Sequence, residues 1–208
     1  MRTIVRIILG MSKGDDTRER ILDRAFRVAT RDGLDGLSIG MLAGELGMSK
    51  SGLFAHFGSK EDLQIEVLRA ASRRFEEFVW RPALKAARGE PRLRRLLERW
   101  MLWVNEPSMP GGCVFVAAAA ELDDKDGRPR DFLVGEQKKL CSALAKAARL
   151  AVEAGHFRAD FDCDQFAFDA YSVVLGYNYQ RRLMRDPKAE TRARRAIERL
   201  LALARAGS

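Results

Sequence analysis

Apolar residues recur every three or four positions along almost the whole chain, the spacing of amphipathic helices. The first such stripe consists of Ile21, Leu22, Ala25, Phe26 and Ala29. It predicts a helix from about Asp16 to Gly33. Alternation of apolar and polar residues, the pattern of half-buried strands, is not sustained anywhere. We therefore predict an all-α fold.

Residues 38–62 contain two short helical patterns joined by a glycine. Ile39, Leu42, Ala43 and Leu46 form the stripe of the first. Gly47 is suited to end that helix, and Ser49 to cap a second helix over 50–57. Two short helices joined by a glycine-containing turn are typical of the helix-turn-helix motif, whose second helix can enter the major groove of DNA. A further helix is predicted from Ser59, with Asp62 as its capping partner.

The chain after Ser59 carries six more stretches of helical spacing. The helix from Ser59 is expected to reach Trp80, where Pro82 breaks or kinks it. Gly89-Glu90-Pro91 forms a connector, and Glu106–Gly112 and Asp123–Pro129 form loops. Helices are predicted over about 93–104, 113–122, 131–154, 164–184 and 189–205. We expect a disordered extension over 1–13, a DNA-binding domain of three helices over 14–62, and a second helical domain over 63–208.

The first residues need a separate interpretation because they are basic and apolar. The apolar run from Ile4 to Leu9 is too short to span a bilayer, and no small-residue cleavage site follows it. A translation start at Met11 instead of Met1 explains this segment more simply. With three cysteines at unpaired spacing, the chain is expected to be cytoplasmic and to have no membrane partner.

The charge of the chain supports a polyanionic partner only weakly. The net charge is +8 over 208 residues, but residues 181–208 hold nine basic and three acidic side chains. Most of the excess therefore lies far from the second helix of the motif. A solvated, arginine-rich helix face explains it better than a second DNA contact.

The helix over 50–57 offers the side chains that a DNA-reading helix needs. Lys50 and Ser51 are polar groups near its N-terminus that suit base edges, and Gly52 allows close approach of the backbone. Leu53 and Phe57 would point inward. Ser38, which caps the preceding helix, is a candidate for contact with phosphate.

The run from Asp16 to Leu68 resembles the DNA-binding domain of the TetR (tetracycline-repressor) family of bacterial regulators. The similar segments are TRERILDRAFRVATRDGLDGLS and LAGELGMSKSGLFAHFGSKEDL. The remainder resembles the family's ligand-binding and dimerisation domain in helical layout, and GGCVFVAAAAELDD is similar to some members. This resemblance implies a homodimeric repressor that binds an inverted-repeat operator in double-stranded DNA and is released by a small apolar or aromatic effector.

The resemblance also implies roles for particular side chains at the DNA. Thr17, Arg18, His56 and Lys60 are similar to residues that contact the phosphate backbone, although Arg18 could equally be an exposed helix charge. Phe54 stands where the family most often has tyrosine, so one hydroxyl contact is missing. Gly40 and Gly44 stand where members often carry side chains that reach DNA, and each glycine weakens the helix by about 1 kcal/mol relative to alanine.

Two sets of residues in the second domain have a functional and a plain structural interpretation. Residues that would surround an effector cavity, or else simply form core, are Trp80, Trp100, Trp103, Cys113, Phe115 and Phe132. Residues that would form a four-helix bundle with a second copy, or else cover their own core, are Phe166, Ala170, Val173, Tyr177, Ile197, Leu200 and Leu201.

Catalysis and metal binding find little support in the sequence. The chain has two histidines, and we find no nucleophile–base set or glycine-rich phosphate loop. Asp162 and Asp164 precede a helix and are better explained as caps than as ligands. Cys113 is better explained as a buried inert thiol than as a redox sensor. We predict no enzyme, no metal and no cofactor; the alternative is a helical small-molecule-binding or enzymatic domain whose N-terminal helices are only a scaffold.

Overall fold

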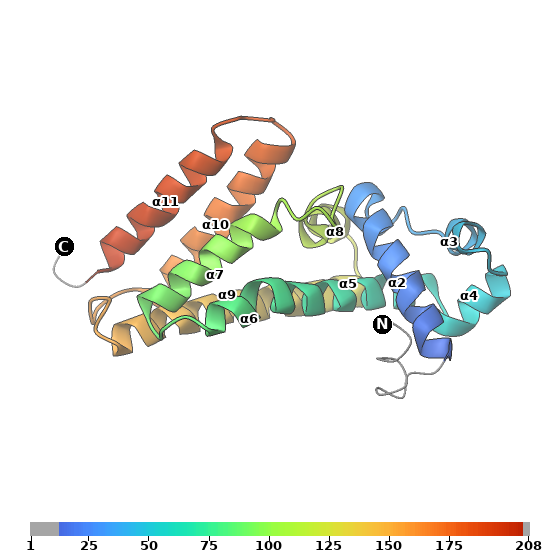
Figure 1. Cartoon of the computed structure of the whole chain (residues 1–208), viewed down its shortest axis with the longest axis horizontal. Coiled ribbons are helices and arrows are strands. Elements are labelled where there is room, and N and C mark those ends of the chain that lie inside the picture. Colours follow the sequence, from blue (N-terminus) through green and yellow to red (C-terminus); the bar gives the residue numbers. More distant parts are fainter. Residues whose placement is uncertain (1–12, 206–208) are drawn as a thin grey trace, which may run out of the picture.

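The computed structural model describes residues 13–205, and it is built from helices throughout that range (Figure 1). The helices are α2 (Lys13–Asp32), α3 (Ile39–Leu46), α4 (Lys50–Phe57), α5 (Lys60–Phe75), the π-helical turn η1 (Glu76–Trp80), α6 (Arg81–Leu84), α7 (Glu90–Trp103), α8 (Val114–Leu122), α9 (Arg128–Glu153), α10 (Cys163–Arg182) and α11 (Ala189–Ala204). Over these residues the extended structure is limited to one bridge between Phe157 and Arg205. The predicted all-helical fold is confirmed.

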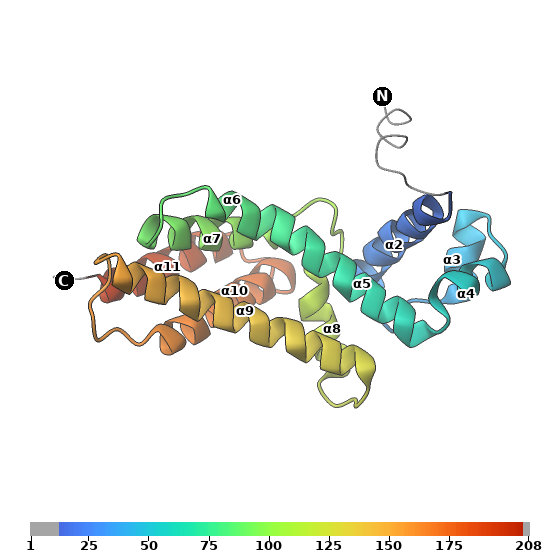
Figure 2. The same ribbon diagram turned by 90° about the horizontal axis from the view of Figure 1, so that it is seen from below.

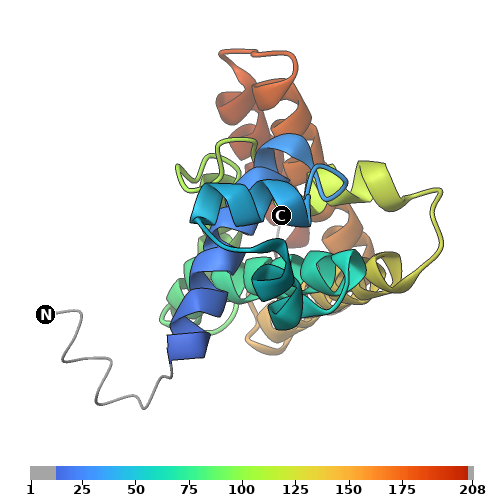
Figure 3. The same cartoon turned by 90° about the vertical axis from the view of Figure 1, so that its right-hand side faces the viewer.

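The molecule is elongated, with the three helices α2 to α4 at one end (Figure 1). The long helices α5 and α9 run side by side along it, and Figure 2 shows them from below. Helices α10 and α11 pack against each other and α10 also packs on α9, while α8 lies beside α2 and contacts α5 and α9. Viewed from the end that carries α2 to α4, α3 and α4 stand in front of all other helices (Figure 3).

The first helix begins earlier than predicted. Helix α2 starts at Lys13, three residues before Asp16, and ends at Asp32. Gly33 follows with a φ of +75°, a conformation that glycine adopts without strain. The predicted stripe of this helix is buried. Of the segment expected to be disordered, residues 1–12 lie outside the described part of the chain.

Proline explains three differences between predicted and observed helices. Pro91 and Pro129 lie in the first turns of α7 and α9, where a missing N–H costs nothing, so both helices begin before the predicted positions. Pro82 does not end the long helix either, because the chain widens into η1 and continues as α6 to Leu84. Arg99 Nε donates to the carbonyl oxygen of Phe78 at 2.8 Å, the group to which an α-helical residue 82 would donate.

Candidate nucleic-acid interface and ligand cavity

Helix α4 presents one face to the core and the other to solvent. Leu53 and Phe57 are buried, whereas Lys50, Ser51 and Phe54 are exposed. The Ser49 side chain accepts the N–H of Gly52 at 3.0 Å, which fixes the start of the helix. Half of the Phe54 surface is exposed, so an aromatic ring lies on the same face as the polar candidates. His56 is half-buried.

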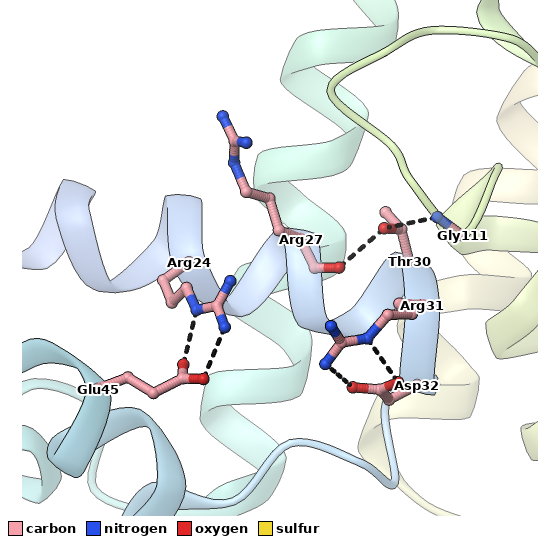
Figure 4. Close-up of polar contacts among 7 residues, drawn as sticks. All are labelled: Arg24, Arg27, Thr30, Arg31, Asp32, Glu45 and Gly111. Atoms are coloured by element: carbon pink, nitrogen blue, oxygen red, sulfur yellow. Dashed lines mark hydrogen bonds and ion pairs between the residues drawn. The ribbon is translucent and has the colours of Figure 1, made fainter.

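Helix α3 is capped at both ends and joined to α2 by an ion pair. Ser38 caps it by accepting the N–H of Met41 at 3.4 Å, and Gly47 ends it with a φ of +65°. The guanidinium of Arg24 in α2 donates two hydrogen bonds, both 2.6 Å long, to the Glu45 carboxylate (Figure 4). The hydrogen bond from Arg24 lowers the pKa of Glu45. The pair anchors α3 to α2 while leaving α4 exposed.

The two glycines of α3 differ in their surroundings. A Cβ at Gly40 would lie 3.1 Å from Cε of Lys50, so the absence of a side chain makes room for the Lys50 stem. Around Gly44 no atom of the described chain, apart from neighbouring residues and the helix's own backbone, comes within 4 Å of such a Cβ. Gly40 therefore has a packing role that its sequence position did not reveal.

The candidates for phosphate contact have different environments. Lys60 is exposed, and its Nζ donates to the carbonyl oxygen of Asp35 at 2.8 Å. Arg18 donates to Glu66 at 2.6 Å and lies 5.2 Å from the centre of the Phe57 ring. This arrangement favours a structural role for Arg18 between α2 and α5. Thr17 is half-buried in α2.

A cavity of about 580 Å³ lies among α5, η1, α7, α8, α9 and α10. Five of the six predicted cavity residues line it, namely Trp80, Trp100, Cys113, Phe115 and Phe132. Trp103 does not line it. Its ring packs in the core, 5.4 Å from Phe75 and 5.7 Å from Phe78 between ring centres. The prediction that Trp103 lines the cavity is therefore not met: Trp100 and Trp103 both pack against Phe75, but only Trp100 reaches the cavity.

Sequence reasoning missed the polar groups of this cavity. Tyr171 donates to Oε1 of Gln137 at 2.8 Å, and burial raises the pKa of Tyr171 to about 12. Asn178 and Glu136 also line the cavity. Tyr171 and Asn178 are seven residues apart on α10, so both lie on one face of that helix. That spacing was the one signal that could have indicated them.

Cys113 lines the cavity as a buried thiol. Burial raises its pKa, and the contact with Trp103 opposes that shift without cancelling it. A thiol with a raised pKa is mostly protonated at neutral pH and is a poor nucleophile. Among residues 13–205 no cluster of three or more His, Cys, Asp or Glu side chains is arranged to hold a metal ion.

The cavity and the helices α2 to α4 are connected through α8. The first residues of this helix, Phe115 and Val116, line the cavity. Near its other end, Glu121 Oε2 accepts the backbone N–H of Asp35 at 2.9 Å. Lys125 pairs with the Asp35 carboxylate at 2.5 Å. The segment that leads into α3 is thus held by the end of the helix that forms a cavity wall.

A second contact lies at the turn before α8. Gly111 N donates to Oγ1 of Thr30 at 3.4 Å (Figure 4), and a Cβ at Gly111 would overlap the Thr30 carbonyl. On the other side, Gln64 Nε2 donates to the carbonyl oxygen of Leu34 at 3.0 Å in a buried position. The turn before α8 therefore contacts the last turn of α2, and α5 contacts the segment that follows α2.

The predicted dimer contacts need correction. Five of them are buried inside the subunit, namely Phe166, Ala170, Tyr177, Ile197 and Leu201. Val173 and Leu200 are half-exposed. A side chain buried in its own core has little surface to offer a second copy. The exposed apolar residues of α10 and α11 lie on other faces: Phe168, Leu175, Tyr179 and Leu203. None of the described helices is apolar over enough residues to cross a membrane.

Comparisons with known proteins give two family matches. The model described as "Bacterial regulatory proteins, tetR family" matches residues 21–67, and "Tetracyclin repressor-like, C-terminal domain" matches residues 89–197. No curated protein matches.

Several solved structures share the fold. A TetR transcriptional regulator from Chloroflexus aurantiacus has a TM-score of 0.81 at 22% identity, and the match covers 92% of this chain and 96% of that one. A TetR-family regulator from Cytophaga hutchinsonii has a TM-score of 0.83 at 20% identity, with 95% and 99% covered. AibR, solved with isovaleryl coenzyme A and operator DNA, has a TM-score of 0.68 at 24% identity, with 90% and 97% covered.

Proposed function

The chain belongs to the tetracycline-repressor family of bacterial regulators, and we propose that it is a cytoplasmic homodimeric repressor released from its operator by a small apolar or aromatic effector. As a family member it is a ligand-responsive, DNA-binding transcriptional regulator, a class that is generally not enzymatic. We propose that the DNA-binding domain comprises residues 14–62 and that the effector and dimerisation domain comprises residues 63–208.

The proposal that the protein binds operator DNA rests on the exposed face of α4. Lys50, Ser51 and Phe54 project from a short helix that is fixed by its cap and by two buried residues. Such a helix can enter a major groove as a rigid unit, with Lys50 and Ser51 at base edges. Ser38, Gly52, His56 and Lys60 would meet the phosphate backbone beside it. One structural relative was solved with operator DNA, which supports this assignment.

The proposal that the protein binds a small effector rests on the cavity. Its aromatic walls suit an apolar or aromatic molecule. That same relative was solved with isovaleryl coenzyme A, a larger and charged compound, so it supports the presence of a small-molecule site but not the chemistry of the effector. A ligand between α5 and α8 would displace Phe115 or Val116, and α8 would pass the shift through Glu121 to Asp35. The separation of the two reading helices would change, and both could no longer engage one operator.

A second copy of the chain is placed against α10 and α11. Leu175 and Tyr179 on α10 and Leu183 directly after it recur every four residues, and all three are exposed. An exposed apolar stripe of this kind marks an interaction surface. Twofold pairing of identical surfaces would present two copies of α4 to the two halves of an inverted repeat.

The test is a gel shift with duplex DNA from upstream of the protein's own gene, at low salt and with a scrambled duplex of equal length as competitor. We expect a specific complex with two subunits per duplex. The double variant Lys50→Ala/Ser51→Ala should lose the preference for the operator, whereas Lys146→Ala, an exposed change on α9, should keep it. A protein that binds neither duplex at low salt would contradict the proposal and favour the scaffold alternative.

A further inference from the structure

We infer that the cavity binds an uncharged aromatic compound that carries one hydroxyl or amide group, and that this group hydrogen-bonds to the side chain of Asn178. The inference rests on the proposed role of the cavity as an effector site and specifies the chemistry of the effector.

Six of the residues that line the cavity are aromatic. Trp100 lies 6.1 Å from Phe75 and 5.7 Å from Tyr171 between ring centres, with the rings tilted steeply against each other. Phe115 and Phe132 line the cavity from α8 and α9. Aromatic rings prefer offset-stacked or edge-to-face neighbours, so a planar ring system gains more from these walls than a flexible alkyl chain does.

Asn178 is the polar group that such a ligand would have to satisfy. Its Oδ1 is buried, and no donor in the described part of the chain lies within hydrogen-bonding distance. A buried amide without a partner is costly, and a carboxamide can both donate and accept. A hydroxyl or amide group on the ligand could hydrogen-bond to the Asn178 carboxamide in either of its two orientations.

The other polar groups of the cavity have partners or can find them within the protein. The hydroxyl of Tyr171 donates to Gln137. Ser72 also lacks a hydrogen-bond partner for its buried hydroxyl, but a helical serine can turn to the carbonyl four residues before it. Asn178 has no such local alternative. Asn178 on α10 is therefore the residue that would select a polar group on the ligand.

The charges around the cavity disfavour an anion inside it. Burial is the largest single effect on Glu136 and raises its pKa, but the nearby polar and charged groups, led by the hydrogen bond from Lys139, together outweigh burial and hold the pKa below its ordinary value. A ligand carboxylate would lie near this negative charge. Arg69 is paired with Glu66 and lies 5.4 Å from the centre of the Phe132 ring, and Arg73 is exposed. Because the lining cations are paired or exposed, a charged ligand would lose more hydration than it regains.

Equilibrium dialysis of the full-length protein against three matched probes tests the inference. The probes are 2-naphthol, 2-methylnaphthalene and 2-naphthoate, which differ in one substituent. We expect 2-naphthol to bind about fivefold more tightly than 2-methylnaphthalene, the gain of one net hydrogen bond. We expect 2-naphthoate to bind at least about tenfold more weakly than 2-naphthol, because its charge would be desolvated beside Glu136.

Two leucine variants connect the selectivity to one side chain. In Asn178→Leu the advantage of 2-naphthol over 2-methylnaphthalene should disappear, whereas it should persist in Gln180→Leu, an exposed change on the same helix. Because both probes are measured on each variant, a general weakening of the site cancels in the ratio. Thermal unfolding of each variant checks that it is folded.

Three results would overturn the inference: no binding of 2-naphthol up to its solubility limit, tighter binding of the naphthoate, or an unchanged ratio in Asn178→Leu. The gel shift on the same preparations separates this outcome from failure of the proposed function. A protein that binds its operator but shows one of these results keeps the proposed function and loses only the ligand class.

Discussion

Gly33 lies directly beneath the carboxylate of Glu121, so close that a Cβ at position 33 would overlap its oxygen atoms. The same carboxylate accepts the backbone N–H of Asp35. A residue at the end of α8 is thereby fitted against the end of α2. Position 33 requires glycine for two reasons: its φ of +75° is strained for other residues, and a side chain there would overlap Glu121.

Removal of the Glu121 carboxylate should loosen the segment between α2 and α3. In Glu121→Ala the N–H of Asp35 loses its acceptor, so we expect faster amide hydrogen exchange over residues 33–38 and unchanged exchange in α9 and α10. Asp124→Ala, an exposed change in the following loop, is the control. Equal protection of residues 33–38 in both variants would show that Glu121 does not hold this segment.

Alanine at two glycines should change stability in opposite directions. Gly33→Ala forces a side chain into a left-handed conformation and against Glu121, and should destabilise the protein by more than about 1 kcal/mol. Gly44→Ala lies within α3 with open space around it and should stabilise it by about 0.5–1 kcal/mol. Urea unfolding measures both. A stabilised Gly33→Ala variant would contradict the close contact.

Acid should weaken the contact between the start of α7 and the C-terminal end of the described chain. Hydrogen bonds from Arg205 and Arg94 lower the pKa of Glu90 despite burial, and Nδ1 of His156 accepts the Glu90 N–H at 3.1 Å. Because the folded pKa lies below the unfolded value, this stabilisation is present above the unfolded pKa of about 4.3 and is lost as the pH falls through the folded value.

The variant Glu90→Gln should therefore be less stable than the wild type at pH 7 and should show a smaller loss of stability between about pH 5 and pH 3. Glu77→Gln, an exposed change on η1, should follow the wild-type profile. Urea unfolding at each pH provides the comparison. If the stability of wild type and Glu90→Gln falls in parallel as the pH is lowered, Glu90 does not cause the acid sensitivity.

A charge on the exposed stripe of α10 should separate two copies of the chain. Tyr179→Glu places a carboxylate on the proposed apolar contact, where it would be buried without a partner, so we expect a monomer by analytical ultracentrifugation. Lys146→Glu on α9 should remain dimeric. If Tyr179→Glu also remains dimeric, the second copy binds elsewhere.

The two exposed lysines of the reading region should differ in their effect on DNA. Lys60→Ala should weaken binding to all duplexes, because it removes a phosphate contact. The slope of log Kd against log salt concentration should fall by about one per subunit. Lys50→Ala, or a change of Ser51, should alter the preferred sequence. Binding isotherms at several salt concentrations measure both effects. Intact affinity and salt dependence in Lys60→Ala would exclude its phosphate contact.

The sequence by itself determined the local elements and the reading motif. Caps such as Ser49 and Asp162, the turn at Gly47, and the inward pair Leu53 and Phe57 follow from interactions within a few residues. Such interactions are readable because helix geometry fixes which neighbours meet. The same reasoning placed five of six candidate residues at the cavity.

Only the tertiary structure decided which face of each helix meets which neighbour. Trp100 and Trp103 differ by less than one helical turn, yet one lines the cavity and the other packs in the core. Tyr177 and Tyr179 belong to one helix, yet the first is buried and the second is exposed. Pro82 lies inside a helical path that continues through the π-helical turn η1, and Arg99, from a different helix, donates to the Phe78 carbonyl. In each case the outcome depends on packing between segments far apart in the chain, and spacing along one helix does not encode that packing.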